Sequence, residues 1–255
     1  MSDSRTVSWF SCGAASAVAT KLALATGKDI TIAYCGIQEE HPDNLRFLRD
    51  CEAWFGQEII LLGNEKYNGS IYEVFEKTRY LVGPSGARCT TELKKNVRKA
   101  FERPDDVQVF GYTAEEQNRV DRFIDANPQV EIWPILVENG LSKEDCLAIL
   151  KKNDIELPEM YKLGYRNNNC IGCVKGGAGY WNKIKVDFPE VFERMAQTEE
   201  LLGRTILRIQ EKGVKRRITL RELTPEKGDY PSEQAIECGF LCELADDKIK
   251  DADDE

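Results

Sequence analysis

Histidine is almost absent from this chain of 255 residues, in which His41 is the only one. Mechanisms that need a second histidine are therefore excluded, among them zinc sites built mainly from histidine. The chain also lacks an apolar run near the roughly 20 residues that a membrane-spanning helix needs. Residues 1–5 show neither the basic start nor the apolar stretch of a signal peptide. We expect a cytoplasmic protein that spans no membrane.

Cysteine is abundant by contrast, with nine residues. In a cytoplasmic protein such cysteines are rarely structural disulfides, and an odd number also argues against complete pairing. Cys12 lies in a turn, while Cys35, Cys51 and Cys146 are most simply small core residues. The other five stand in contexts that suggest chemistry: Cys89, Cys170, Cys173, Cys238 and Cys242.

The net charge of −9 is unevenly placed. Residues 243–255 contain seven acidic residues and two lysines, which gives them −5 and leaves −4 for the rest. We expect this tail to be disordered and solvated. A basic segment interrupts the near-neutral body, and we interpret it either as a phosphate-contacting surface or as an ordinary solvated helix face. Its members are Lys94, Lys95, Arg98, Lys99 and Arg103.

The first half of the chain alternates between strand and helix patterns. Strands are expected at residues 6–10, 30–35, 58–62, 107–111 and 131–136, and helices at 16–26, 43–55, 91–101 and 114–127. This order predicts an α/β fold with a doubly wound, mostly parallel sheet and helices on both faces. In such sheets ligands bind at the carboxyl ends of the strands, near the point where the strand order reverses.

The second half of the chain has a different pattern. Ser142 is the expected N-cap of a helix at 143–152, and a loop-rich segment with a cysteine pair begins at residue 157. A helix at 189–202 and a hairpin of residues 206–210 and 217–223 follow. We therefore divide the chain into an α/β domain (1–155), a loop-rich cysteine-bearing appendage (156–242) and the acidic tail (243–255).

A run of small residues, Ser11-Cys12-Gly13-Ala14-Ala15-Ser16, follows the first strand and opens the next helix. Small residues there let backbone N–H groups and hydroxyls approach an anion at the helix N-terminus. The run is not a Walker P-loop, because it lacks the terminal Gly-Lys-Ser/Thr. A tight strand–helix turn without a ligand is the alternative interpretation.

This run resembles the Ser-Gly-Gly-x-Asp-Ser loop of the adenine-nucleotide hydrolase-like superfamily, with matches at Ser11, Gly13 and Ser16. Ala15 stands in place of the aspartate. That departure fits the phosphoadenosine phosphosulfate reductase branch, whose loop is degenerate and whose members do not split ATP. The resemblance implies that residues 1–155 bind an adenine nucleotide.

Two further segments resemble the same family, His41-Pro42 and the stretch from Gly111 to Arg119. Arg119 would offer a guanidinium fork to phosphate or sulfate, although it could equally form an i,i+4 pair with Glu115. The nucleotide-binding residues that the resemblance implies are Ser11, Gly13, Ser16, Arg88, Lys94 and Arg119.

The pair Cys170-Ile171-Gly172-Cys173 is the strongest single signal. Alone, it could be half of a metal site, a redox dithiol or two unrelated cysteines. The stretch from Gly164 to Cys173 resembles the Gly-Tyr-x-Ser-Ile-Gly-Cys-x-x-Cys of iron–sulfur adenylylsulfate reductases. Arg88-Cys89 resembles the beginning of their Arg-Cys-Cys-x-x-x-Lys stretch, with Thr90 in place of the second cysteine.

The segment Glu237-Cys238-Gly239 resembles the C-terminal motif that carries the attacking cysteine of these enzymes, with Leu241 in place of the motif histidine. The resemblance therefore implies that Cys238 is the nucleophile, although Cys238 also rivals Cys242 as a metal ligand.

A thiol such as Cys89, beside Arg88 and a helix N-terminus, is expected to have a lowered pKa. The implied ligands of a [4Fe–4S] cluster are Cys89, Cys170, Cys173 and Cys242. Four thiolates can also bind zinc, and spacing does not separate the two metals.

Taken together, the resemblance implies a phosphoadenosine phosphosulfate reductase-like enzyme that reduces an adenylyl sulfate to sulfite. The first alternative is an ATP-dependent iron–sulfur sulfurtransferase that modifies nucleic acid, and the second is a non-catalytic nucleotide-binding protein with structural zinc. The expected partners are an adenine nucleotide and a thioredoxin- or glutaredoxin-like reductant. Nucleic acid and a second copy of the chain are further candidates.

Overall fold

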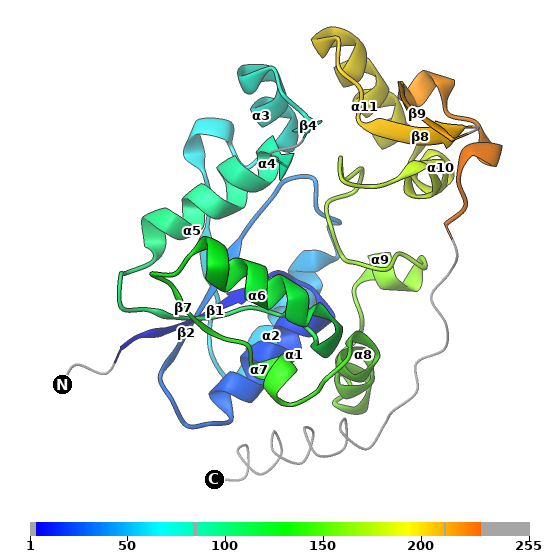
Figure 1. Ribbon diagram of the computed structural model, residues 1–255. Coiled ribbons are helices and arrows are strands. Elements are labelled where there is room, and N and C mark those ends of the chain that lie inside the picture. The colour runs from blue at the N-terminus through cyan, green and yellow to red at the C-terminus, as the bar shows by residue number, and fades with distance from the viewer. Residues whose placement is uncertain (1–3, 84–85, 212, 231–255) are drawn as a thin grey trace.

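The structure is a computed structural model that describes residues 4–83, 86–211 and 213–230. Its centre is a sheet of five parallel strands in the order β3-β2-β1-β6-β7 (Figure 1). The strands are β1 (Thr6–Phe10), β2 (Ile30–Cys35), β3 (Ile60–Leu62), β6 (Val107–Val109) and β7 (Glu131–Trp133). The predicted α/β fold with a parallel sheet flanked by helices is confirmed.

Helices cover both faces of the sheet. Successive side chains of β1 point to opposite faces, and all five are buried, so both faces need covering. Phe10 enters the larger core, where its ring stacks on Phe47 of α2 at 6.1 Å. Trp9 enters the opposite core, which Val97 of α5 also joins. The helices of this half are α1 (Ala14–Leu24), α2 (Asn44–Phe55), α3 (Ile71–Thr78), α4 (Arg88–Thr90), α5 (Asn96–Phe101), α6 (Gln117–Ala126), α7 (Ile135–Glu138) and α8 (Lys143–Lys152).

The strand order reverses between β1 and β6. From β1 the chain runs outward through β2 and β3, and it then returns to the other side of β1 for β6 and β7. The turn after β1 and Gly111 after β6 meet at this point, since a Cβ on Gly111 would lie 2.6 Å from the Ser16 backbone nitrogen. The run Ser11 to Ser16 therefore lies where sheets of this kind bind ligands.

Several element boundaries differ from the predicted ones. Pro134 follows the shortened β7, so the residues after it form α7 instead of extending the strand. The helical run expected from residue 91 begins at Arg88 and contains a π-helical turn at Thr91–Lys95. The helix after Ser142 is confirmed as α8, and the Ser142 hydroxyl accepts a hydrogen bond from the Asp145 N–H at 3.1 Å.

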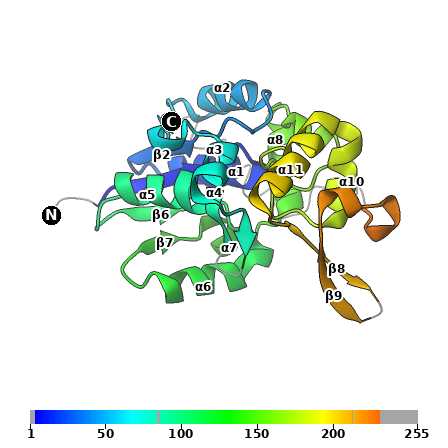
Figure 2. The same ribbon diagram turned by 90° about the horizontal axis from the view of Figure 1, so that it is seen from above.

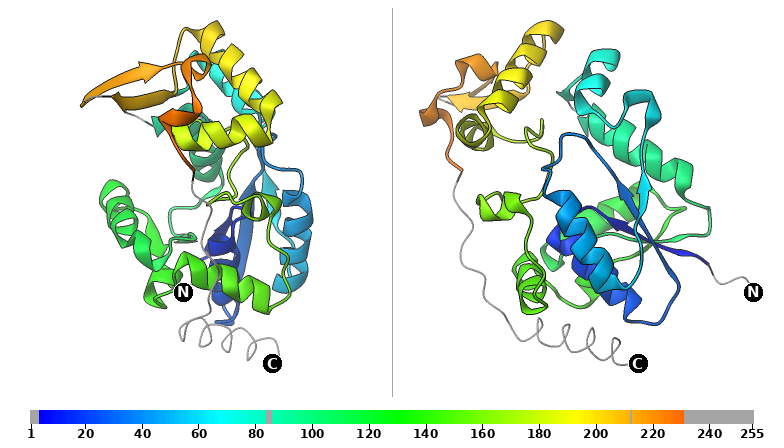
Figure 3. Two further views of the ribbon diagram at one scale, coloured as in Figure 1. Left: turned by 90° about the vertical axis from the view of Figure 1, so that its right-hand side faces the viewer. Right: turned by 180° about the vertical axis from the view of Figure 1, so that it is seen from behind.

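A second hydrophobic core lies beside the sheet and combines residues from both sides of the expected boundary at 155. Phe75 and Leu93 come from before that boundary, and Trp181 and Met195 come from after it. The later elements are α9 (Glu159–Lys162), α10 (Ala178–Asp187), α11 (Pro189–Leu202), β8 (Leu207–Glu211) and β9 (Val214–Ile218) (Figure 3). The helix expected at 189–202 is confirmed as α11. The hairpin is confirmed with its second strand earlier than expected, and α3, α9 and α10 were not predicted.

The cysteines of the sheet region are buried. Cys12, Cys51 and Cys146 have no exposed surface, and Cys35 is 9% exposed. The prediction that Cys35, Cys51 and Cys146 are small core residues is confirmed. No helix in the described ranges is long and apolar enough to cross a membrane.

Candidate functional site: a cysteine-lined cavity

Cys170 and Cys173 lie on a loop that Tyr180 holds from the first turn of α10. The Tyr180 hydroxyl accepts hydrogen bonds from the backbone N–H groups of Gly172 and Cys173, both at 3.0 Å, and donates to the Cys170 carbonyl at 3.2 Å. Gly172 has a φ of +76°, a conformation that glycine adopts without steric cost. One side chain therefore fixes the backbone of the whole cysteine pair.

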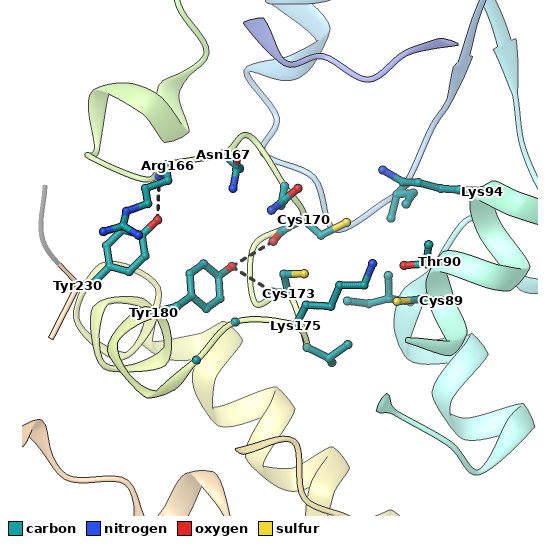
Figure 4. A pocket seen from close by; sticks show the side chains of 16 residues that line it. Cys89, Thr90, Lys94, Arg166, Asn167, Cys170, Cys173, Lys175, Tyr180 and Tyr230 are labelled. Atoms are coloured by element: carbon teal, nitrogen blue, oxygen red, sulfur yellow. Dashed lines mark hydrogen bonds between the residues drawn. The ribbon is translucent and has the colours of Figure 1, made fainter. Parts of the chain in front are cut away.

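A cavity of about 410 Å³ opens beside this loop. Cys89 and Lys94 line it from the helical run that begins at Arg88, and Cys170, Cys173 and Lys175 line it from the loop. The three sulfur atoms point into the same space (Figure 4). The remaining lining residues are Ile37, Ile71, Thr90, Arg166, Asn167, Asn169, Val174, Gly176, Gly177, Tyr180 and Tyr230. Two segments far apart in the sequence thus bring three thiols to one cavity.

These three thiols are half-buried. For Cys89 and Cys170, burial favours the protonated form. Burial raises the pKa of Cys170 well above its usual range, against the opposing effect of Lys94. Burial and the nearby Cys173 raise the pKa of Cys89 to about 11. The expectation of a lowered pKa at Cys89 is therefore wrong for the free thiol. The guanidinium of Arg88, the cation expected to lower this pKa, pairs with Glu92 at 2.8 Å.

Lys94 provides a cation between the cavity and a buried carboxylate. Its Nζ lies 3.5 Å from Oε1 of Glu40, which is 7% exposed and also accepts hydrogen bonds from Tyr34 and Asn44. Burial opposes the charge of Lys94, but Glu40 and Cys170 raise its pKa above the ordinary value. Lys94 therefore stays protonated and can face an anionic group in the cavity.

Thiolates are donors that suit zinc or an iron–sulfur cluster, so the chemistry of the cavity wall fits a thiolate-bound group. Within the described ranges, however, no three cysteine, histidine or acidic side chains are arranged to hold a metal ion. Cys89, Cys170 and Cys173 thus share a cavity without forming a closed site. A group bound here would have to draw the three sulfurs together and take a further ligand from elsewhere.

Cys238, the predicted nucleophile, and Cys242, the predicted fourth ligand, lie outside the described residues. The last described residue is Tyr230, which lines the cavity and whose hydroxyl accepts a hydrogen bond from the Arg166 N–H at 2.7 Å. The described chain therefore ends at the cavity, eight residues before Cys238.

Ser11, Gly13 and Ser16 lie together in the turn at the N-terminus of α1. The Ser16 hydroxyl accepts hydrogen bonds from the Ser11 N–H and the Ser11 hydroxyl, both at 3.0 Å, and donates to the Gly13 carbonyl at 2.9 Å. The Tyr161 hydroxyl accepts a hydrogen bond from the Ala14 N–H at 3.3 Å. These contacts hold the turn together within the protein, so they suit either a preformed anion site or a turn without a ligand.

A buried side chain connects this turn to the cysteine loop. Asn168 donates from Nδ2 to the Cys12 carbonyl at 2.6 Å and to Oδ1 of Asn44 at 2.7 Å. Its own Oδ1 is buried without a hydrogen-bond partner among the described residues. Asn168 lies two residues before Cys170, so the nucleotide-type turn and the cysteine cavity belong to one connected framework.

Of the predicted anion-binding cations, Lys94 lines the cavity, whereas Arg88 and Arg119 do not. Arg119 is exposed, pairs with Glu116 one helical turn away and lies 5.0 Å from the centre of the Tyr112 ring. The alternative i,i+4 pair with Glu115 is therefore not the one formed. The basic segment around Lys94 is also not one solvated face, because Arg98 is buried and pairs with Glu102 at 2.8 Å.

His41 has a local role, since its Nδ1 accepts a hydrogen bond from the Asp43 N–H at 3.2 Å. Three functional candidates were missed by the sequence analysis: Lys175, Tyr180 and Asn168. Lys175 had a usable signal, because it follows Cys173 by two residues. Tyr180 and Asn168 had none, since their roles depend on contacts that local pattern does not encode.

Comparisons with known proteins add a distant relative to this description. No protein-family model matches the sequence, and no solved structure matches it. The chain is 26% identical over 193 residues to "Uncharacterized protein MJ0066" of Methanocaldococcus jannaschii. The alignment covers 72% of this chain and 39% of that protein, so the chain spans well under half of the relative's length.

Proposed function

We propose that this protein reduces an adenylyl sulfate to sulfite, with Cys238 as nucleophile and a cysteine-held [4Fe–4S] cluster beside the reacting sulfur. The observation that supports this most is that Cys89, Cys170 and Cys173 meet at one cavity beside Lys94. These are residues on which the resemblance to iron–sulfur adenylylsulfate reductases rests. The seven cysteines that the structure describes form no disulfide, which would also suit the cytoplasm, where thiols stay reduced.

The position of Tyr230 supports a role for the C-terminal cysteines. Cys238 and Cys242 follow it by eight and twelve residues, and an extended chain spans up to about 3.5 Å per residue. Either cysteine is thus within reach of a cavity that Tyr230 itself lines. In this proposal Cys242 completes the ligand set and Cys238 stays free to react.

The nucleotide phosphates bind at the turn of Ser11, Gly13 and Ser16, where the N-terminus of α1 favours an anion. The sulfate extends into the cavity, where Lys94 and Lys175 face its negative charge. The link from Asn168 to the Cys12 carbonyl keeps the turn and the cysteine loop in a fixed relation. Both ends of the substrate are thereby held by one framework.

The reaction then takes two displacements. The Cys238 thiolate attacks the sulfate sulfur, a sulfur–sulfur bond forms, and the nucleotide leaves with the electron pair of the broken sulfur–oxygen bond. A thioredoxin- or glutaredoxin-like dithiol next attacks the Cys238 sulfur, and sulfite leaves. The second thiol of the reductant closes its own disulfide and regenerates Cys238. The two electrons that reduce the sulfur therefore come from the dithiol.

When bound by Cys89, Cys170, Cys173 and Cys242, a [4Fe–4S] cluster would supply a fixed charge beside the cavity. Lys94 and Lys175 would face the combined charge of these thiolates. The positively charged wall thus has two uses, to hold the sulfate and to offset the negative ligands.

The test is anaerobic purification followed by assay of sulfite release from adenylyl sulfate and from its 3′-phosphorylated form, with thioredoxin as reductant. We expect sulfite release and about four irons and four sulfides per chain. Cys238→Ser should abolish sulfite release and keep the iron, whereas Cys242→Ser should lose iron. If the iron is lost in Cys238→Ser instead, the two cysteines have exchanged roles and this assignment of the nucleophile fails.

The same preparation separates the alternatives. ATP turnover without sulfite release would favour the sulfurtransferase, a function that the absence of an acid at Ala15 argues against. Stoichiometric zinc, with neither sulfite release nor ATP turnover, would favour the second alternative, a non-catalytic nucleotide-binding protein.

A further inference from the structure

The hairpin of β8 and β9 is a two-stranded ribbon that extends from the second core into solvent (Figures 2 and 3). One face is anchored, since Leu207, Ile209 and Ile218 are buried in the second core. The pairing register sets Arg208 directly opposite Arg217. Because side chains alternate along a strand, the face away from the core carries four polar or cationic residues. These are Arg208, Gln210, Lys215 and Arg217, all exposed.

The cations on this face differ from neighbouring cations in whether they form ion pairs with carboxylates. Arg221, next to the ribbon in sequence, pairs with Glu193 and with Glu200, and Arg216 on the other face lies 3.7 Å from Glu222. For Arg208, Lys215 and Arg217, no carboxylate that the structure describes lies within ion-pair distance. These three residues are here called the ribbon cations. They form a local positive surface on a chain whose net charge is −9.

The arrangement is also costly for folding. Like charges directly opposite each other on an antiparallel pair are destabilising, and Arg208 and Arg217 occupy such a position. The only hydrogen bond recorded for Arg217 in the described residues goes to the Thr205 carbonyl at 2.9 Å, which leaves its charge unbalanced. An external polyanion would remove this repulsion.

We propose that the outer face of the β8–β9 ribbon binds duplex nucleic acid through its phosphates. A two-stranded ribbon has dimensions that fit the major groove of DNA, and guanidinium forks match phosphate geometry. Gln210 lies among the ribbon cations and is a residue type that can contact base edges. A membrane surface suits the ribbon less well, because Val214 is its one large exposed apolar side chain among the described residues.

The experiment measures binding of the full chain to a fluorescein-labelled DNA duplex by anisotropy, over a series of salt concentrations. We expect binding at low salt that weakens as salt rises, because phosphate contacts release counterions. Replacing all three ribbon cations by glutamine (R208Q, K215Q and R217Q) should weaken binding at least about tenfold. It should also reduce the slope of log affinity against log salt by about three, roughly one per lost contact.

Three arms make the result specific. The matched variant K95E with K99E removes exposed cations from the basic helical segment and should leave most of the binding in place. The conservative variant R208K with R217K should keep the salt slope, which shows that the triple variant acts through charge. Thermal unfolding of each variant identifies any that fails to fold. If the triple variant fails, the single variant K215Q decides the question, since it should weaken binding and reduce the salt slope by about one.

The proposal is overturned if wild-type protein does not bind the duplex at low salt, or if K95E with K99E abolishes binding while the triple variant keeps it. Binding to vesicles of phosphatidylcholine and phosphatidylserine, without binding to the duplex, would also overturn it, as would capture by an acidic polypeptide alone. This test is independent of sulfite release, so either proposal can fail while the other stands.

Discussion

The two regions of the molecule place the same residue type in different surroundings. In the sheet region Cys51 and Cys146 are fully buried and pack as small apolar side chains. Near the second core, Cys89, Cys170 and Cys173 stay half-buried and line a cavity with two lysines. The surroundings of each cysteine, either a cavity wall or a closed core, therefore distinguish the candidate reactive thiols from the structural ones.

The difference follows from how each region is built. The sheet region repeats one local unit, a strand followed by a covering helix, which closes its core around every thiol. The cavity is formed where the run from Arg88 to Lys94 meets the loop around Cys170. Side chains at such a junction face each other across a gap, which leaves room for a ligand.

The largest expected effect tests this division through metal content. Cys173→Ser should lose most of the roughly four irons per chain expected of the anaerobic protein, because it removes a thiolate from the cavity wall. Cys146→Ser removes a sulfur of the sheet region and should keep the iron and the brown colour. Iron and sulfide analysis of both variants measures the effect. Equal loss in the two variants would show that the proposed division is wrong.

Thiol labelling of metal-free protein should separate the same groups by rate. Iodoacetamide should modify Cys89, Cys170 and Cys173 first, since they line a cavity open to solvent. Cys12 and Cys51 have no exposed surface and should react only when the protein opens, at rates lower by orders of magnitude. Mass spectrometry of peptides over time gives the rates. Equal labelling rates at all of these cysteines in the folded protein would contradict the expectation that the cavity exposes Cys89, Cys170 and Cys173.

An ion pair at one end of the sheet tests whether the regions differ in stability. The guanidinium of Arg5 donates to both oxygens of Asp106 at 2.9 and 2.6 Å, and Asp106 is 2% exposed. Burial opposes the charged carboxylate, but Arg5 and the Arg103 N–H outweigh burial and lower the pKa of Asp106 below its ordinary value. Asp106→Asn should therefore lower the free energy of unfolding by about 3 kcal/mol at neutral pH.

The pH dependence of that pair has a definite sign. A lowered pKa stabilises the fold above the unfolded value of about 3.9, and this contribution is lost as the pH falls through the folded pKa. Urea unfolding should show that wild type has a higher free energy of unfolding than Asp106→Asn at neutral pH. This difference should disappear at acidic pH, where Asp106 is protonated. Labelling of Cys173 should be unchanged in the variant, because neither Arg5 nor Asp106 lines the cavity.

The sequence was a good guide to the sheet region and a partial guide to the cavity. The strands Thr6–Phe10 and Ile30–Cys35 were predicted with their observed bounds, because apolar runs between turn residues are local signals. The convergence of Cys89 with Cys170 was predicted only through the resemblance. Arg88 was assigned to the anion site, but it forms an ion pair with Glu92 that i,i+4 spacing alone could have indicated.

Long-range contacts account for what the sequence did not predict. The helix α10 was missed because its apolar residues, such as Trp181, serve a core shared with residues more than eighty positions earlier. Asn168 lies in the segment that was expected to be loop-rich, yet it is buried against Cys12. No local pattern distinguishes a solvated asparagine from one that joins two segments.

The smallest expected effect concerns the hydroxyl that holds the cysteine loop. Tyr180→Phe removes the partner of the Gly172 and Cys173 N–H groups and of the Cys170 carbonyl. Because the site is only partly buried, we expect a loss near the lower end of the 1–3 kcal/mol typical of an unsatisfied group. Labelling of Cys170 and Cys173 should become faster, while Cys51 stays protected.

Tyr230→Phe is the matched control for this change. Among the described residues, the Tyr230 hydroxyl accepts one hydrogen bond, from the Arg166 N–H, on the same cavity wall. It should alter the labelling of Cys170 less than Tyr180→Phe does. If both variants change the labelling equally, the loop is not held by Tyr180 in particular, and access to the thiols depends on the cavity as a whole. If only Tyr180→Phe does so, the cysteine pair opens as a local unit while the sheet region stays closed.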